Sequence, residues 1–259
     1  MTDGALPAPA SGGIAGRAAA ALRLGARLLA LLLALLTLLT PTLLARALRR
    51  PHNPWPRRFL ALAARVLGIR VRLVGTRAPG TVLILANHVS WIDILAIGGT
   101  GSAFVGHDGL AVVPLVRWLA RLNDTVFIAR HDRAGVAAQV AQLRDALAEM
   151  GTVSLFPEGT TGDGVALLPF KSSLLGALEP LPEGVVIQPV WLDYGTAVPG
   201  VAWVGAEPGV ANFRRIAARA RPVDVRVHFL PPLAGEALAH RKAITAAARS
   251  AIAAAMAAG

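Results

Sequence analysis

The sequence predicts an α/β fold, a sandwich around a central sheet that follows an apolar helical segment. From residue 69 onward, short runs rich in β-branched residues alternate with stretches of helical periodicity. One uncharged run, at 28–45, approaches the ~20 residues that usually cross a membrane. The chain has 259 residues, of which 54% are hydrophobic, and its mean hydropathy is +0.56. It is therefore long enough for one domain with a sizeable core, and apolar enough to suggest contact with lipid.

The first 68 residues are expected to precede the catalytic domain. Residues 1–16 are small and polar and are expected to be disordered, whereas 17–68 should form a membrane-associated helical segment. The run 28–45 reads LLALLLALLTLLTPTLLA, and Pro41 within it indicates a kink or an early helix end. Arginines flank the run and are more numerous after it. This bias predicts that the catalytic domain lies on the cytoplasmic side of the inner (cytoplasmic) membrane.

Three interpretations of the apolar run stay open. It can span the bilayer, or it can lie within one leaflet. It can also be a signal peptide cleaved near Ala45-Arg46-Ala47, although the arginines that follow disfavour export. Residues 54–68 place apolar residues at helical spacing among arginines, which is typical of an interfacial helix or of a surface helix packed on the core.

Residues 69–259 form the predicted catalytic domain. Strands are expected at 71–74, 82–86, 103–105, 125–128, 153–156, 185–191, 201–204 and 223–230. Helices are expected at 92–97, 113–122, 134–150, 171–178, 213–220 and 236–258. Such alternation predicts helices packed on a central sheet.

The formal net charge of +11 comes almost entirely from arginine, because Lys171 and Lys242 are the only lysines. Attraction to anionic lipid headgroups and a compositional bias explain this equally well. Aromatic and basic residues are not interleaved, so a nucleic-acid partner is not expected. The chain has no cysteine, which excludes disulfides, thiolate metal sites and a cysteine nucleophile.

The segment 87–93 reads NHVSWID and links an apolar strand to a helix start. Ser90 and Asp93 alone fit a helix capping pattern. The same spacing also lets the Asp93 carboxylate reach one nitrogen of His88, which leaves the other nitrogen to remove a proton from a hydroxyl. The motif G-x-S-x-G is absent. A base without an enzyme nucleophile suits direct attack of a substrate alcohol on a thioester.

Three further segments follow apolar runs. The turn FPEGT at 156–160 is expected to present Glu158 and Thr160 to substrate hydroxyls, or to be a plain surface turn. VFIAR at 126–130 ends in Arg130, and a strand-end arginine can clamp a phosphate. VIQPVW at 186–191 is expected to be structural or to line an acyl pocket.

The blocks NHVSWID, VFIAR, FPEGT and VIQPVWLDY occur in this order within residues 82–195. This set resembles the lysophosphatidic acid (1-acylglycerol-3-phosphate) O-acyltransferase family and the wider glycerolipid acyltransferases. The resemblance implies a sandwich with a central mixed sheet and a membrane-embedded N-terminal helical anchor. It implies a lysolipid acceptor of the 1-acyl-sn-glycerol-3-phosphate type, acyl-CoA or acyl carrier protein as donor, and no cofactor.

The same resemblance implies that His88 is the general base and Asp93 its orienting partner. It places Arg130 at the acceptor headgroup and Pro189 near the acyl chain. The full substrate-binding set that we predict is Asn87, Ser90, Arg130, Glu158, Gly159, Thr160 and Lys171.

One departure concerns the acceptor. Lysophosphatidic acid enzymes commonly follow FPEGT with arginine and serine, whereas this chain reads TGDG and later LPFKSS. Lys171 can partly replace the missing arginine. These two segments more closely resemble the branch that acylates lyso-ornithine lipid. The headgroup of that lipid is zwitterionic, so Asp163 can interact with its ammonium group. Two hypotheses of other classes are a metal hydrolase, for which ligand spacing is lacking, and a non-catalytic membrane-binding protein.

Overall fold

The computed structural model describes residues 13–48, 53–107, 117–118, 120, 122, 125–128 and 136–259. Its first element, helix α1 (Ile14–Ala47), begins inside the tail that was expected at 1–16. The helix continues through Pro41, so the early helix end predicted there is wrong. Packing stabilises this stretch, because Thr42 and Ala45 on the same side of the helix are buried. Within the described residues, α1 alone is long and apolar enough to cross a membrane.

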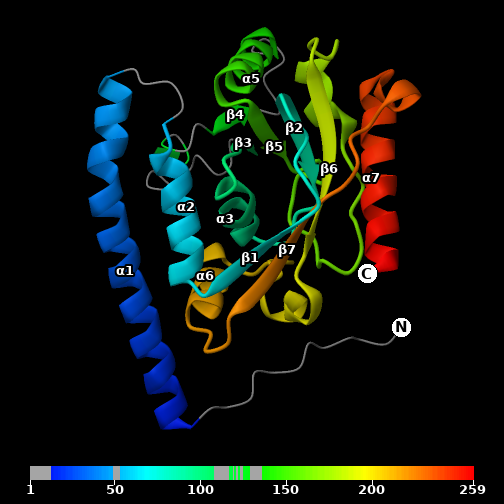
Figure 1. The fold of residues 1–259 in the computed structure, drawn as a ribbon. Coiled ribbons are helices and arrows are strands. Elements are labelled where there is room, and N and C mark those ends of the chain that lie inside the picture. Colours follow the sequence, from blue (N-terminus) through cyan, green and yellow to red (C-terminus); the bar gives the residue numbers. More distant parts are fainter. Residues whose placement is uncertain are drawn as a thin grey trace.

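Helix α2 (Trp55–Val66) lies between α1 and the rest of the domain (Figure 1). It buries Leu60, Ala63 and Ala64. Of the two interpretations of this segment, the structure therefore has the helix packed on the core. Proline in its first turn fits a helix start, because the missing N–H has no partner there in any helix.

The described strands form one seven-stranded sheet in the order β1-β7-β6-β2-β5-β3-β4. Their bounds are β1 (Ile69–Val74), β2 (Thr81–Ala86), β3 (Ala103–His107), β4 (Val126–Ile128), β5 (Thr152–Leu155), β6 (Val185–Asp193) and β7 (Val223–Phe229). Only the β6–β7 pair is antiparallel, so the sheet is mixed as expected. Strand β2 lies between β5 and β6, and its continuous apolar run is buried on both faces.

Each face of the sheet has its own hydrophobic core. Side chains alternate along β2, so that Ile84 joins the core beneath α2, α3 (Ile92–Gly98) and α6 (Gly209–Ala217). Leu83 joins the core beneath α5 (Val136–Met150) and α7 (Arg241–Ala258). The sheet is therefore sandwiched between two helical layers, as Figure 1 shows.

Two expected elements differ in the structure, and one element was not expected. No strand forms at 201–204, because the N–H groups of Val201 and Ala202 bond to the carbonyl of Val198 and that of Trp203 bonds to Val89. The helix expected at 171–178 is the 3-10 helix η2 (Ser172–Leu178). A 3-10 helix, η3 (Gly195–Gly200), also follows β6.

The last predicted helix, at 236–258, is divided in two. A 3-10 helix, η4 (Gly235–Leu238), precedes α7. His240 begins α7, because its Nδ1 accepts a hydrogen bond of 3.1 Å from the Ala243 N–H. Most of the helix expected at 113–122 lies outside the described residues.

Candidate active site

The candidate site lies where three neighbouring strands end. Strand β2 runs parallel to both β5 and β6, so the segments after Ala86, Leu155 and Asp193 lie together at the C-terminal ends of these strands. They carry NHVSWID, FPEGT and a tyrosine, Tyr194. Ligand sites of α/β sheets commonly form at the C-terminal ends of the strands. The two motifs, 70 residues apart in sequence, are thus brought together.

His88 and Asp93 form the predicted pair. The Nδ1 atom of His88 lies 2.7 Å from Oδ2 of Asp93. The Asp93 side chain is fully buried, whereas that of His88 is 18% exposed. A carboxylate accepts from a ring N–H, so Nδ1 carries the proton in the neutral ring and Nε2 keeps its lone pair. The pair can therefore accept a proton at Nε2.

The Asp93 carboxylate receives three further donors. Its Oδ2 accepts from the N–H groups of Val89 at 2.6 Å and Ser90 at 3.0 Å, and its Oδ1 accepts from the Tyr194 hydroxyl. The Ser90 hydroxyl is buried without a hydrogen-bond partner among the described residues, so the half of the capping pattern that relied on it is wrong. Asp93, in the first turn of α3, instead holds the segment that leads into the helix, because it accepts from two N–H groups that precede α3.

Tyr194 is buried against this carboxylate. Burial and the charge of Asp93 raise the pKa of the Tyr194 hydroxyl well above its ordinary value. The hydroxyl therefore stays protonated and donates to Asp93. Tyr194 was not among the predicted site residues, although it is the only tyrosine of the chain and directly follows β6.

Phe156 holds the other side of the histidine. Its ring stacks on the imidazole of His88, with a centroid distance of 4.1 Å and an interplanar angle of 12°. Phe156 was predicted only as part of the FPEGT turn and not as a partner of His88. A hydrogen bond to Asp93 and a stacked ring together fix the plane of the imidazole, so that Nε2 has a defined direction.

Glu158 joins the two motifs and does not face solvent. Its Oε1 accepts from the His88 N–H at 2.8 Å, and its Oε2 accepts from the Leu168 N–H at 3.0 Å. Only 2% of the residue is exposed, so the expectation that the turn presents this side chain is wrong. Burial raises the pKa of Glu158, and the two backbone hydrogen bonds oppose that rise. Thr160, in contrast, is exposed.

The loop after FPEGT is held against His88. The Gly162 N–H donates to the His88 carbonyl at 2.7 Å, and the Thr161 hydroxyl donates to the carbonyl of Trp203. Gly164 has φ +74°, and a Cβ there would meet Val89 at 3.2 Å. Glycine therefore permits both the turn and the close approach of this loop.

Two charged residues lie exposed at the ends of this loop. Asp163 is exposed, and its Oδ1 accepts from the N–H groups of Val165 and Ala166 at 2.9 and 3.1 Å. Lys171 is exposed, and its N–H donates to the Pro157 carbonyl at 2.8 Å. The segment 163–171 thus carries one acidic and one basic exposed side chain, and its backbone is bonded to the FPEGT turn.

The other predicted residues have varied positions. Asn87 is buried and bridges β2 to β6, because its side chain bonds to both the N–H and the carbonyl of Leu192. Gly159 has φ +69°, which suits the tight turn. Pro189 lies within β6, and Arg130 lies outside the described residues. Among the described residues, no three His, Asp or Glu side chains cluster closely enough to hold a metal ion.

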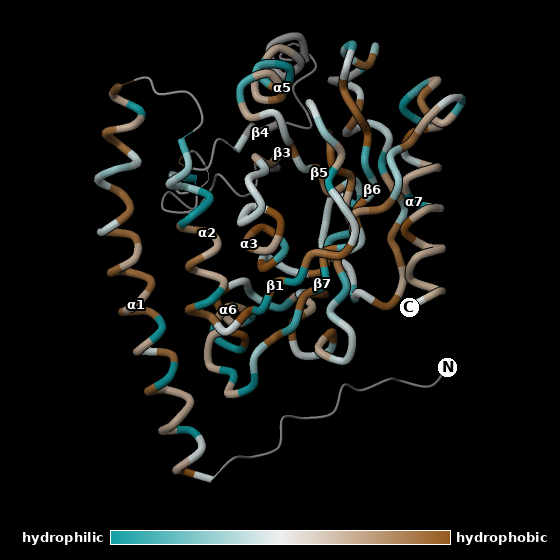
Figure 2. The backbone as a smooth tube through the Cα atoms, viewed as in Figure 1, coloured by the Kyte–Doolittle hydropathy of each residue, from teal (hydrophilic) through white to brown (hydrophobic). Residues whose placement is uncertain are grey.

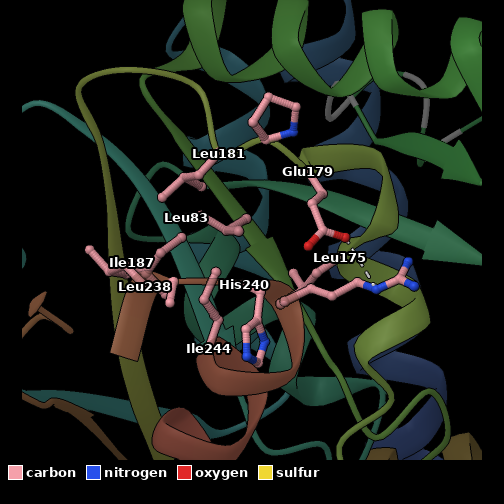
Figure 3. Close-up of a pocket in the computed structure, with 11 residues that line it drawn as sticks. Leu83, Leu175, Glu179, Leu181, Ile187, Leu238, His240 and Ile244 are labelled. Carbon is pink, nitrogen blue, oxygen red and sulfur yellow. Dashed lines mark ion pairs between the residues drawn. The ribbon is translucent and has the colours of Figure 1, made fainter. Parts of the chain in front are cut away.

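Two cavities lie away from this site. One, of about 460 Å³, lies on the α7 side of the sheet, where aliphatic side chains such as Leu83, Ile187 and Ile244 surround it and a Glu179–Arg241 ion pair stands at its edge (Figure 3). The other, of about 630 Å³, lies between α2, α3 and β1. Neither lining includes the His88–Asp93 pair.

Comparison with known proteins agrees with this arrangement. Residues 69–193 match the family model described as Acyltransferase. The chain is 34% identical over 251 residues, 92% of its length and 90% of the relative, to a lyso-ornithine lipid O-acyltransferase from Rhodobacter capsulatus. It is also 34% identical over 152 residues, 56% of its length and 59% of the relative, to a 1-acyl-sn-glycerol-3-phosphate acyltransferase from Neisseria gonorrhoeae.

A solved structure shares the fold. The crystal structure of the 1-acyl-sn-glycerophosphate acyltransferase PlsC from Thermotoga maritima superposes with a TM-score of 0.64, over 93% of this chain and 97% of that one. The two sequences are 20% identical. This likeness bears out the predicted sandwich with its mixed sheet and N-terminal helix.

Proposed function

The chain belongs to the acyltransferase family that contains the lyso-ornithine lipid and 1-acyl-sn-glycerol-3-phosphate O-acyltransferases, and from this premise we propose that His88 and Asp93 catalyse acyl transfer to a lysolipid. The observation that carries the proposal is the 2.7 Å contact between Nδ1 of His88 and a fully buried carboxylate. It leaves Nε2 as a base of fixed direction at the C-terminal end of β2.

The proposed reaction needs one base and no covalent enzyme intermediate. Nε2 of His88 takes the proton of the lysolipid hydroxyl while its oxygen attacks the thioester carbonyl. The C–O bond of the new ester forms and the C–S bond of the thioester breaks. The proton on Nε2 then passes to the thiolate that leaves. Asp93 stabilises the imidazolium between these two steps without accepting a proton itself.

The proposed acyl donor is acyl-CoA or acyl carrier protein, and the reaction as written calls for no cofactor. Both donors present a thioester that is already activated, so binding and orientation supply most of the remaining acceleration. The buried bonds of Asp93 and the stacked Phe156 ring support this orientation on the enzyme side.

We propose lyso-ornithine lipid as the acceptor. The relatives with that name include one aligned over 92% of this chain, whereas the lysophosphatidic acid relative from Neisseria gonorrhoeae aligns over 56%. A zwitterionic headgroup also suits the loop, where the Asp163 carboxylate faces an ammonium group and the Lys171 ammonium faces a carboxylate. Both side chains are exposed on segments that bond to the two motifs.

A phosphate-bearing acceptor of the 1-acyl-sn-glycerol-3-phosphate type is the second candidate. Lys171 favours it, because this exposed cation belongs to a segment that bonds to the FPEGT turn. Asp163 disfavours it, since an exposed carboxylate repels a phosphate.

We also propose that α1 lies within one leaflet and does not span the bilayer. Leu24, Leu31, Ala34, Thr42 and Ala45 form a contact stripe toward the domain along about 30 Å of helix. That length equals the hydrocarbon thickness, so a spanning α1 would draw the packed domain into the bilayer.

The opposite side of α1 consists of exposed leucines, which would face the hydrocarbon in this arrangement. Figure 2 shows the apolar colour along most of the helix. These exposed residues are Leu28, Leu29, Leu32, Leu33, Leu36, Leu43 and Leu44. Arginines on both sides of the run 28–45 support placement at the cytoplasmic face of the inner membrane.

A competition assay tests the activity. The purified full chain receives an acyl thioester donor and equal amounts of both lysolipids, and the products are separated by mass. We expect diacylated ornithine lipid to dominate, and dominance of phosphatidic acid would assign the second acceptor. His88→Ala should abolish transfer while the protein stays folded, whereas His240→Ala, a histidine on the α7 side, should keep transfer. Full activity of His88→Ala would refute the mechanism.

The headgroup assignment has its own variants. Lys171→Gln and Asp163→Asn should each raise KM for lyso-ornithine lipid about tenfold, since each loses one charge-assisted contact. Lys242→Gln removes the only other lysine, on exposed α7, and should leave KM unchanged. Equal effects of the two lysine changes would contradict the headgroup assignment.

Labelling tests the placement of α1. The chain lacks cysteine, so Ile14→Cys and Leu48→Cys each introduce a single thiol at one end of the helix. Both thiols should react with a membrane-impermeant maleimide from the same side of sealed vesicles. Reaction from opposite sides would establish a span.

A further inference from the structure

We propose that the cavity between α2, α3 and edge strand β1 binds the headgroup of an anionic phospholipid of the bilayer. This cavity measures about 630 Å³ and contains none of the residues of the His88 site. That volume is typical of small-ligand sites and holds a phosphodiester headgroup. The inference rests on the proposed placement of α1 within one leaflet, and not on the chemistry of the His88–Asp93 pair.

The charge of the cavity selects an anion. Arg27, Arg65 and Arg70 line it, and no acidic residue does. Arg65 and Arg70 are exposed, and neither guanidinium group has an ion-pair or hydrogen-bond partner among the described residues. Guanidinium groups bind phosphate oxygens through paired hydrogen bonds, so two free arginines on facing elements form a fitting clamp.

Arg27 has a different role, because its hydrogen bonds hold α1 in place beside the cavity. Its Nη1 donates to the carbonyls of Ala217, the last residue of α6, and of Arg219 just after it, both at 2.9 Å. Its Nη2 lies where a Cβ on Gly68 would be 2.7 Å away. Arg27 therefore brings the charge of α1 to the cavity while tying α1 to the domain.

The remaining lining suits a lipid better than a free phosphate. Apolar side chains from three elements contribute to it, among them Val71, Leu73, Leu95 and Ala96. Among the described strands, β1 is at the edge of the sheet and pairs with β7 alone, so its outer N–H groups can donate to a ligand oxygen. Apolar walls beside cationic groups match the junction of a headgroup and its first acyl carbons.

The position relative to α1 identifies the source of this lipid. Arg27 directly precedes the uncharged run 28–45, and Leu28 and Leu29 beside it are exposed. With α1 in the leaflet, this boundary lies at headgroup depth. A lipid whose phosphate occupies the cavity can then keep its chains in the bilayer beside these leucines. Such a lipid would hold the orientation of the domain on the membrane.

Binding of short-chain lipids tests the proposal without reference to activity. The full chain in neutral detergent is titrated with dihexanoyl phosphatidylglycerol, dihexanoyl phosphatidylcholine or inorganic phosphate, and binding is followed by calorimetry. We expect saturable binding of the anionic lipid, at least about tenfold tighter than that of the zwitterionic lipid or of phosphate, since only the first combines a net charge with an apolar part.

A matched pair of double variants locates the site. Arg65→Gln with Arg70→Gln should weaken binding of the anionic lipid about tenfold or more, since two phosphate contacts are lost. Arg58→Gln with Arg72→Gln makes the same charge change on the same two elements, outside the cavity lining, and should change binding less than twofold.

Three results would overturn the proposal: no saturable binding by the wild type, equal weakening in both double variants, or phosphate binding as tightly as the lipid. If the wild type binds the anionic lipid but transfers no acyl group, only the catalytic proposal would be refuted.

Discussion

Replacing Tyr194 by phenylalanine removes one hydroxyl group and leaves the aromatic ring in place. That hydroxyl donates to Oδ1 of Asp93, and both residues are buried. A hydrogen bond to a charged partner contributes about 1.5–3 kcal/mol, and the variant leaves a buried carboxylate oxygen without its donor. We therefore expect the free energy of unfolding to fall by about 2 kcal/mol, or roughly 4–8 °C in unfolding temperature for a domain of this size.

The same variant should affect catalysis through position. Asp93 loses one of the four donors that hold it, and His88 takes its direction from Asp93. A displaced base lowers kcat about 10- to 100-fold, whereas KM should stay within about twofold, because Tyr194 is buried behind Asp93. Steady-state kinetics with a saturating acyl thioester and a range of lysolipid concentrations measure both constants.

Thr245→Val is the matched control, because it also removes a buried hydroxyl. This hydroxyl donates to the Arg241 carbonyl at 3.0 Å within α7, on the far face of the sheet. The control should lose a smaller amount of stability and keep kcat. A Tyr194→Phe protein with kcat within about twofold of wild type would refute the claim that the hydroxyl positions Asp93.

Three other predictions concern neighbouring contacts. Phe156→Leu removes the ring stacked on His88, so kcat should fall about tenfold in steady-state assays; an unchanged kcat would show that the stack is dispensable. Burial raises the pKa of Glu158 above its ordinary 4.5, so the folded state binds this proton more tightly than the unfolded chain. Stability contributed at this site is therefore present at low pH and is lost as pH rises from about 4.5 through the raised pKa. In denaturant titrations between about pH 4 and pH 8, wild type should lose stability relative to Glu158→Gln as the pH rises. A difference in stability that does not depend on pH would contradict this. The double variant Arg23→Gln with Arg27→Gln removes the hydrogen bonds from α1 to the carbonyls at the end of α6. The free energy of unfolding in denaturant should fall by about 1–3 kcal/mol, and proteolysis after α1 should become faster. Proteolysis as slow as in wild type would contradict the role of these two arginines.

The motifs of the site could be read from the sequence because their spacing is local. His88 and Asp93 are five residues apart across a strand-to-helix junction, and so short a separation restricts where the two side chains can point. The order of the blocks also indicated the acyltransferase family, and the family comparison bears this out. Strands with continuous apolar runs, such as β2, were found for the same reason: their pattern depends on neighbours along the chain.

Other assignments failed because distant segments compete for the same backbone groups. Residues 201–204 have strand-like composition, yet the N–H of Trp203 bonds to Val89, more than a hundred residues earlier. The sequence around Glu158 is typical of a surface turn, yet its side chain is buried because it accepts hydrogen bonds from two backbone N–H groups of other segments. Composition does not encode such partners.

The sequence by itself determined the local features of this protein: the short spacing of His88 and Asp93, the apolar helix, and the lack of cysteine and of a G-x-S-x-G motif. Only the tertiary structure decided how these parts act together. It brought Tyr194 and Phe156 to either side of the pair, turned Glu158 inward, and laid α1 along the domain with its leucines outward. Residue types and local spacing follow from the order of the chain, whereas contacts between strand ends and between layers depend on how the sheet and its helices pack.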